Sequence, residues 1–341
     1  MILPGLIFPG IEETMMSNNA KIKFPVEDNS CRDSGFSARI HDDEFQRDQS
    51  LFDDGRSKSD RLISRKSDDI KKKDSILTEL PLALKNKEIE IYYQPIVSMA
   101  TNQPVCFEAL LRWNHPVMGL IYPNDFIPIA EEHGLIKEIG EWVIKNSCRQ
   151  LTKWQNEFPS EPPISVSVNV SPRQLEDQDL LHVVEQTLSD NDPDHGSLIL
   201  EITESSIIRN TKMAGMIINS LRSMGVKIFL DDFGVGFSSL DVLRKFPFDS
   251  IKLDRSIVWR MSKSNKDMEV IRRIFELGLK LKKEIVAEGI ETIDQQQELK
   301  EMHCKLGQGY LFAKPLTINS VDLMLKTPVS GNRCNFSLGT V

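Results

Sequence analysis

The stretch EIYYQPIVSMATNQPVCFEALLRW, at Glu90–Trp113, contains two strand-like segments with a short connection between them. The segments are EIYYQPIVS and VCFEALLRW, and only a few residues around Ala100–Gln103 join them. Parallel neighbours in a sheet need a crossover of a dozen or more residues, so this pair is expected to form an antiparallel hairpin. The first strand is therefore predicted to run opposite to the second.

Further segments with strand character follow this pair towards the C-terminus. They are ISVSVNVS, LILEIT, KIFLDDF, SIKLD, EIVAEGIE and LGQGYLF. Most are separated by stretches with helical periodicity, which lie at Ile136–Phe158, Met213–Met224, Met268–Leu281 and Gln295–Met302. Alternating strands and helices favour parallel strands with crossover helices, and eight strands can close into a barrel. The predicted fold is α/β, a TIM-like (β/α)8 barrel with an antiparallel first strand.

The chain before this pattern has a different composition. Residues from about Glu27 to Asp74 are rich in charged residues and serine and contain few large apolar residues. Such a segment buries too little apolar surface to offset the entropy of ordering, so residues 1–74 are predicted to form a disordered or regulatory N-terminal arm. Apolar residues recur with helical spacing from Ile76, and Asp74 or Ser75 could cap that helix. The folded domain is therefore predicted to span 75–328, with a C-terminal tail at 329–341.

Charge and cysteine content limit the possible partners and location. The 341 residues carry a formal net charge of -8, which argues against a nucleic-acid partner because such partners require clustered Lys and Arg. Five cysteines are scattered without a CxxC pair, which is typical of reduced thiols in a cytosol. No run is long and apolar enough to span a membrane, and the opening MILPGLIFPG lacks a basic leader. A cytoplasmic protein without a membrane span is predicted.

Charged and amide side chains lie near the C-terminal ends of the predicted strands, where barrel enzymes place their active sites. They are Glu108, Arg112, Asn169, Glu201, Glu204, Asp231, Asp232, Lys252, Asp254, Glu288, Glu291 and Gln308. So many converging carboxylates would repel one another unless cations lie between them. Hard oxygen ligands with one amide suit Mg²⁺ or Mn²⁺ rather than zinc, and the tandem acids Asp231 and Asp232 could serve two metals that share a bridging water. Adjacent residues point to opposite faces of a regular strand, so both acids reach the site only if the chain turns there.

Each of these residues also has a structural interpretation. Lys252 could form a buried pair with Asp254, and Glu204 and Glu291 could cap or anchor the helices that follow them. The DDFG sequence could be an ordinary turn. The recurrence of polar residues at seven successive strands favours a functional site over these interpretations.

The motifs at these positions resemble those of the EAL domain family, which hydrolyses the bacterial second messenger cyclic di-GMP. The resemblance runs from about residue 75 to 328, in order and in register, and its motifs are YYQPIV (Tyr92–Val97), EALLRW (Glu108–Trp113), SVNVS (Ser167–Ser171), LEITES (Leu200–Ser205), DDFGVGFSSL (Asp231–Leu240), IKLD (Ile251–Asp254), AEGIE (Ala287–Glu291) and GQGYLFAKP (Gly307–Pro315). The family barrel also has an antiparallel first strand. One departure is the presence of Val235 and Phe237, where the family more often has Thr and Tyr.

The resemblance implies roles for the polar residues. The implied ligands are Glu108, Asn169, Glu201 and Asp231 for a first metal, and Asp231, Asp232 and Glu288 for a second. Lys252 is implied to orient the attacking water, and Gln308 to support the metals and water. Implied substrate contacts are Gln94, Leu110, Arg112, Asp254 and Glu291, with Arg112 meeting a phosphate. Glu204 resembles the residue that anchors the loop after Asp232, through which the family also forms a homodimer.

These expectations describe an enzyme with two Mg²⁺ or Mn²⁺ ions that converts cyclic di-GMP to linear pGpG. Two alternatives remain: a non-catalytic receptor or protein-binding scaffold of the same family, and a barrel metallohydrolase for another phosphodiester. Receptors can lose Glu108, Asp231 or Lys252, and this sequence keeps all three. The segment HDDEF at His41–Phe45 resembles the GGDEF cyclase motif only superficially, because it lacks the glycines of the tight turn.

Overall fold

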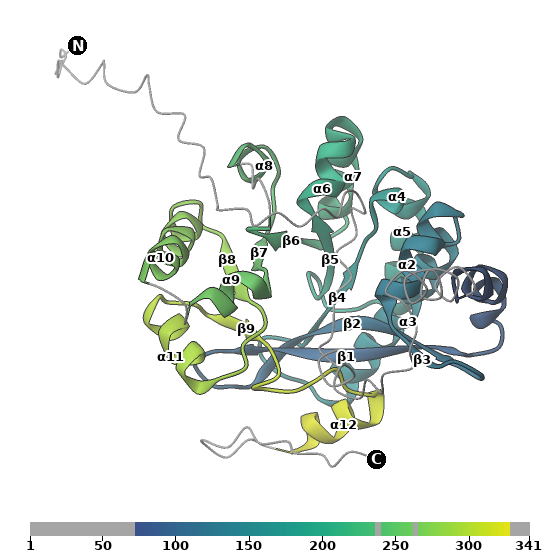
Figure 1. Cartoon of the computed structure of the whole chain (residues 1–341), viewed down its shortest axis with the longest axis horizontal. Coiled ribbons are helices and arrows are strands. Elements are labelled where there is room, and N and C mark those ends of the chain that lie inside the picture. Colours follow the sequence, from purple (N-terminus) through teal and green to yellow (C-terminus); the bar gives the residue numbers. More distant parts are fainter. Residues whose placement is uncertain (1–71, 236–239, 262–264, 328–341) are drawn as a thin grey trace, which may run out of the picture.

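The computed structural model describes residues 72–235, 240–261 and 265–327 and contains a closed eight-stranded barrel with helices around it (Figure 1). The strands are β1 (Ile89–Ser98), β2 (Pro104–His115), β4 (Ser165–Asn169), β5 (Leu198–Thr203), β6 (Lys227–Phe233), β7 (Ser250–Leu253), β8 (Glu284–Ala287) and β9 (Leu306–Gln308). β1 pairs antiparallel with both β2 and β9, and the successive pairs from β2 to β9 are parallel. The predicted barrel with one reversed strand is confirmed.

A further strand, β3 (Gly119–Ile121), extends β2 as an antiparallel partner outside the barrel. This strand is not predicted from the sequence, because three residues are too few to show an alternating pattern.

Helices connect the parallel strands and cover the barrel. They are α2 (Pro123–Glu132), α3 (Ile136–Glu157), α4 (Pro172–Leu175), α5 (Asp179–Asn191), α6 (Glu204–Arg209), α7 (Thr211–Ser223), α8 (Leu240–Lys245), α9 (Arg255–Arg260), α10 (Asn265–Lys280), α11 (Ile293–Glu301) and α12 (Ile318–Lys326). The four helical stretches predicted from periodicity correspond to α3, α7, α10 and α11, with ends that differ by up to three residues.

Residues 72–83 form the first described helix, and its predicted capping was wrong. Asp74 and Ser75 lie inside the helix, where the Ser75 hydroxyl donates to Glu79 Oε1 at 2.6 Å instead of capping a terminus. The helix extends towards the N-terminus through lysines, which are good helix formers. Its apolar side packs on the core through Ile76 and Leu80, which are both buried. The rest of the predicted arm lies outside the described residues.

The barrel interior is layered. One apolar layer consists of Ile96, Cys106, Ile199, Phe229 and Val286, which form a buried cluster separate from the main core between strands and helices. Each of these residues lies two positions along its strand from a polar residue of the next layer, and alternation places both on the same face. The polar partners are Gln94, Glu108, Glu201, Asp231 and Glu288. The apolar layer therefore closes the barrel beneath a polar layer at the C-terminal ends of the parallel strands.

Gly309, in the GQGY motif after β9, is required by a close approach of two chain segments. A Cβ atom at this position would lie 2.1 Å from the carbonyl oxygen of Ile290. No side chain fits there, so the loops after β8 and β9 can pack together at the rim of the polar layer only because residue 309 is glycine.

Candidate active site

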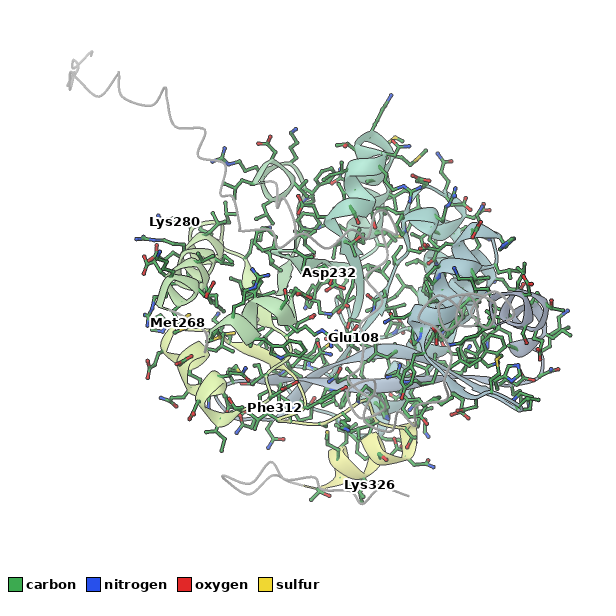
Figure 2. All side chains as sticks on the ribbon, viewed as in Figure 1. Glu108, Asp232, Met268, Lys280, Phe312 and Lys326 are labelled. Atoms are coloured by element: carbon green, nitrogen blue, oxygen red, sulfur yellow. The ribbon has the colours of Figure 1, made fainter. Side chains whose placement is uncertain are left out.

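The ammonium group of Lys252 forms the centre of the polar layer. Lys252 lies on β7, is fully buried, and contacts four carboxylates from four other segments of the barrel. Its Nζ lies 2.6 Å from Glu201 Oε2, 2.9 Å from Glu288 Oε1, 3.1 Å from Glu108 Oε2 and 3.5 Å from Asp231 Oδ1. We call these four acids and Lys252 the Lys252 cluster. Figure 2 labels Glu108, which lies on β2 in the central part of the molecule.

The Lys252 cluster has an excess of buried negative charge. Its four carboxylates are each 3% exposed or less, and a single ammonium is shared among them. Removing ions from water costs several kcal/mol per ion, so a buried set of like charges requires further compensation. Bound cations would supply it. The interpretation of Lys252 as a structural partner of Asp254 was wrong, since its carboxylate partners come from other strands around the barrel.

Hydrogen bonds from two amide side chains, Asn169 and Gln308, fix the orientation of Glu108. Asn169 Nδ2 donates to Glu108 Oε1 at 2.9 Å, and Gln308 Nε2 donates to Glu108 Oε2 at 2.8 Å. Gln308 Nε2 also donates to Gln94 Oε1 at 3.1 Å, and Gln94 Nε2 donates to the carbonyl oxygen of Ala313 at 3.2 Å. The structure thus brings Gln94, Asn169 and Gln308 together with the Lys252 cluster.

The tandem acids of β6 lie at an irregularity in the strand. Pairing with β7 runs from Leu230↔Ile251 to Phe233↔Leu253, so β6 has one extra residue here. Asp232 has a φ of 56°, in the left-handed region that Asp tolerates better than most residues. The strand therefore departs from regular alternation at Asp231 and Asp232, as expected if both acids are to serve one site. Asp232 is half-buried and is labelled in Figure 2.

Leu110 and Arg112 extend the site along β2. They follow Glu108 at two-residue spacing, so the three side chains share one face of the strand. Both are buried, and Arg112 donates from Nη1 to the carbonyl oxygen of Leu111 at 2.7 Å. Burial lowers the pKa of the Arg112 guanidinium, although an arginine remains protonated at neutral pH.

Three predicted site residues lie just beyond strand ends, at helix N-termini. Asp254 caps α9, and its Oδ1 accepts a hydrogen bond from the Ser256 backbone N–H at 2.8 Å. Glu204 is the first residue of α6, where a negative charge suits the helix dipole. The side chain of Glu291 is exposed, and its backbone N–H donates to Gln295 Oε1 at 2.8 Å. The catalytic, anchoring and substrate-binding roles of these three residues stay predictions. Glu204 was expected to anchor the loop after Asp232, but residues 236–239 of that loop, which include Phe237, lie outside the described residues.

The donors at this site fit hard divalent cations. They are carboxylate oxygens with one amide, the ligand chemistry that Mg²⁺ and Mn²⁺ prefer. Within the described residues no group of three or more His, Cys, Asp or Glu side chains has a ready metal-ligating arrangement, and Lys252 lies among the carboxylates instead. The charge excess of the Lys252 cluster still favours added cations.

Two residues next to the site, Tyr92 and Tyr122, were not predicted from the sequence, and both contact Arg112. Tyr92 precedes Gln94 by two residues on β1, so strand alternation could have identified it. Tyr122 immediately precedes α2, and no pattern in the sequence marks it.

None of the helices in the described part of the chain has the length and apolar character needed to cross a membrane.

Comparison with known proteins identifies several relatives. Cyclic di-GMP phosphodiesterase NbdA of Pseudomonas aeruginosa is 37% identical over 248 residues, which cover 73% of this chain and 31% of the relative. Cyclic di-GMP phosphodiesterase PdeR of Escherichia coli is 38% identical over 239 residues, which cover 70% and 36%. The chain thus spans about a third of the length of these curated relatives.

Solved structures show the same fold. The c-di-GMP complex of the PaMucR phosphodiesterase is 36% identical and superposes with a TM-score of 0.69, covering 72% of this chain and 99% of that one. The form of the EAL enzyme Bd1971 with cAMP and cyclic di-GMP bound is 33% identical, with a TM-score of 0.71 and coverage of 74% and 69%. The EAL domain family model matches residues 77–315, which include all the motifs quoted from the sequence. The chain belongs to the EAL domain family.

Proposed function

We propose that this chain is a phosphodiesterase that hydrolyses cyclic di-GMP to linear pGpG. The observation that carries the proposal is the Lys252 cluster, a buried set of four carboxylates around one ammonium at the C-terminal ends of the barrel strands. The relatives NbdA and PdeR are both named cyclic di-GMP phosphodiesterases, and PaMucR was solved in complex with c-di-GMP.

Two divalent ions, Mg²⁺ or Mn²⁺, are proposed as cofactors. The first would be held by Glu108, Asn169, Glu201 and Asp231, and the second by Asp231, Asp232 and Glu288. When bound, such ions would lower the pKa of a bound water and would stabilise the charge on the attacking and leaving oxygens. They also reverse the sign of an acidic site, which allows it to accept a dianionic substrate.

The side chains of the Lys252 cluster position the attacking water. Lys252 Nζ lies within 3.5 Å of oxygens from all four acids, so a water held by any of them is within reach of the ammonium. One N–H of Lys252 would donate to one lone pair of this water and leave the second lone pair for the attack. Asn169 and Gln308 keep the Glu108 carboxylate in a single orientation through one hydrogen bond to each of its oxygens.

Substrate is proposed to bind over this layer. Arg112 would donate two hydrogen bonds to a phosphate oxygen pair, a geometry that its planar guanidinium favours. Leu110 lies between Arg112 and Glu108 on β2 and would supply an apolar contact, while Gln94 supplies an amide. Asp254 and Glu291 lie at the rim after β7 and β8 and are proposed to contact the rest of the substrate.

A homodimer through the face near the loop after Asp232 is also proposed. Large apolar side chains are exposed on α6 and α7, which both contact β6, and on the loop after Asp232: Ile208, Met216 and Val235 are 56%, 48% and 57% exposed. Apolar surface of this kind is favourable to bury between two copies. Sedimentation of the wild type and the Ile208→Glu variant tests this. We expect a dimer that the charge dissociates, and a wild-type monomer at high concentration would contradict the proposal.

Hydrolysis is tested with the purified chain, cyclic di-GMP, and Mg²⁺ or Mn²⁺, with EDTA as the control. We expect pGpG in both metals and none in EDTA. Tight binding of cyclic di-GMP without product in either metal would instead identify a non-catalytic receptor. Faster turnover of another cyclic nucleotide or of pGpG would identify a different phosphodiesterase.

A further inference from the structure

Arg112 is contacted by two tyrosine rings from different elements. Its Cζ lies 5.7 Å from the ring centroid of Tyr92 on β1 and 5.3 Å from that of Tyr122, the residue before α2. Both distances are within the range of a cation–π interaction. Both tyrosines are half-buried, whereas Arg112 is 4% exposed. We call Tyr92 and Tyr122 the aromatic pair.

The aromatic pair stabilises the Arg112 charge without neutralising it. Among the described residues no carboxylate forms a direct ion pair with Arg112, although burial lowers its pKa and the Glu108 charge acts to raise it. One hydrogen bond, from Nη1 to the Leu111 carbonyl oxygen, holds the guanidinium. A carboxylate partner would occupy two of its N–H donors and cancel its charge. A ring face attracts a cation through its quadrupole and leaves the edge donors available.

We propose that Tyr92 and Tyr122 are positioning residues that hold Arg112 so that its remaining N–H donors face a substrate phosphate. This inference rests on the proposed function, because it assigns Arg112 to phosphate binding. The two rings approach from β1 and from the start of α2, so together they restrict a long side chain that has many rotamers. Preorganisation of this kind reduces the entropy that substrate binding must overcome.

The ring, rather than the hydroxyl, is expected to matter. Tyr122→Ala should lower kcat/KM about 5- to 30-fold, chiefly through KM, which is the size expected for a partly desolvated cation–π contact. Tyr92→Ala should act in the same direction. Tyr122→Phe keeps the ring and should remain within about twofold of the wild type.

A double-mutant cycle tests whether Tyr122 acts through Arg112. In an Arg112→Ala background, Tyr122→Ala should lower kcat/KM by less than about twofold, because the group that it positions is already absent. An equal loss in both backgrounds would overturn the proposal. So would a Tyr122→Phe variant as impaired as Tyr122→Ala, since that result would place the effect on the hydroxyl.

Phe158→Ala provides a matched control, because Phe158 contacts Lys326 in a similar cation–π geometry, at 5.9 Å, away from the Lys252 cluster. It should leave kcat/KM within about twofold of the wild type once thermal unfolding confirms a folded variant. If the wild type hydrolyses cyclic di-GMP and Tyr122→Ala does so equally well, the positioning role of Tyr122 is refuted while the proposed function stands. If the wild type binds without hydrolysis, the same comparisons apply to Kd. If it neither binds nor hydrolyses, the proposed function fails and the inference with it.

Discussion

Lys252→Met is the perturbation that tests the electrostatics of the site most sharply. It removes an ammonium that contacts four carboxylates at 2.6–3.5 Å and keeps a long side chain in the same buried position. Removal of one partner from a buried ion pair costs about 3–5 kcal/mol, because it leaves a buried charge uncompensated. Without divalent ions, we expect the Lys252→Met variant to lose at least this much free energy of unfolding. For a domain of this size, a loss of about 3–5 kcal/mol corresponds to a decrease in Tm of about 6–20 °C.

The loss of stability in the Lys252→Met variant should depend on whether divalent ions are present. Divalent ions would supply positive charge to the same carboxylates, so the deficit of the variant should shrink in saturating Mg²⁺ as binding shifts the folding equilibrium. Activity should not recover, because an ion cannot replace an oriented donor to the attacking water. We expect kcat to fall about 10²- to 10⁴-fold, the range for a positioned proton-transfer or donor group.

The assay is urea unfolding followed by circular dichroism, in EDTA and in Mg²⁺, together with pGpG formation. Lys227→Met is the matched control, because Lys227 is an exposed strand lysine on β6, and its loss should change stability by no more than about 0.5 kcal/mol. Unchanged stability of the Lys252 variant in EDTA would refute the account of the cluster. An equal deficit with and without Mg²⁺ would refute the placement of the ions among these acids.

Three further predictions concern the strand bulge, a close approach and a buried thiol. Asp232→Asn should keep the fold, since Asn tolerates the left-handed φ of 56°, but its activity should fall at least about 100-fold. Asp232→Val should lose activity and also have a lower Tm, because a β-branched residue is strained at this φ. Full activity in the Asn variant would contradict a metal-binding role. Gly309→Ala should cost at least about 2 kcal/mol in urea unfolding, because its Cβ would lie 2.1 Å from the Ile290 oxygen; wild-type stability would show that the loops can separate. Burial raises the pKa of the Cys106 thiol from 9.0 to about 12. The stability that the buried neutral thiol contributes is therefore complete below pH 9, and it is lost as the pH rises towards 12 because the unfolded chain then releases the proton more readily. The free energy of unfolding should fall above pH 9, with a slope that Cys106→Ala reduces by about 1.4 kcal/mol per pH unit, and an identical slope in both proteins would be evidence against this burial.

The reversed strand and the polar layer could be predicted from the sequence because both depend on local rules. The connection around Ala100–Gln103 was too short for a parallel crossover, and β1 and β2 are antiparallel. Alternation along each strand placed Glu108, Glu201 and Lys252 on inward faces at one end of the barrel, and all three are buried there.

Contacts across the barrel could not be predicted from the sequence, because they depend on the stagger of the strands. Composition and spacing allowed Lys252 to pair with Asp254 on its own strand, whereas it lies among acids up to 144 residues away in sequence. Tyr122 lies after β3, a strand of three residues, so no periodic pattern placed it near Arg112. The helix at 72–83 begins before its predicted caps, Asp74 and Ser75. Lysine is a good helix former, so the lysines before Asp74 can belong to the helix as well as to the segment in front of it.

The central claim is that this buried cluster hydrolyses cyclic di-GMP. The most direct measurement compares the wild type with Glu108→Ala for pGpG formation from cyclic di-GMP in Mg²⁺ and in Mn²⁺, with circular dichroism confirming that the variant is folded. Glu108 receives hydrogen bonds from Asn169 and Gln308 and contacts Lys252, so its removal should disrupt the whole arrangement. The account predicts pGpG from the wild type and at least about a 1,000-fold lower rate from the variant. No pGpG from the wild type in either metal, or equal rates from the two proteins, would contradict it.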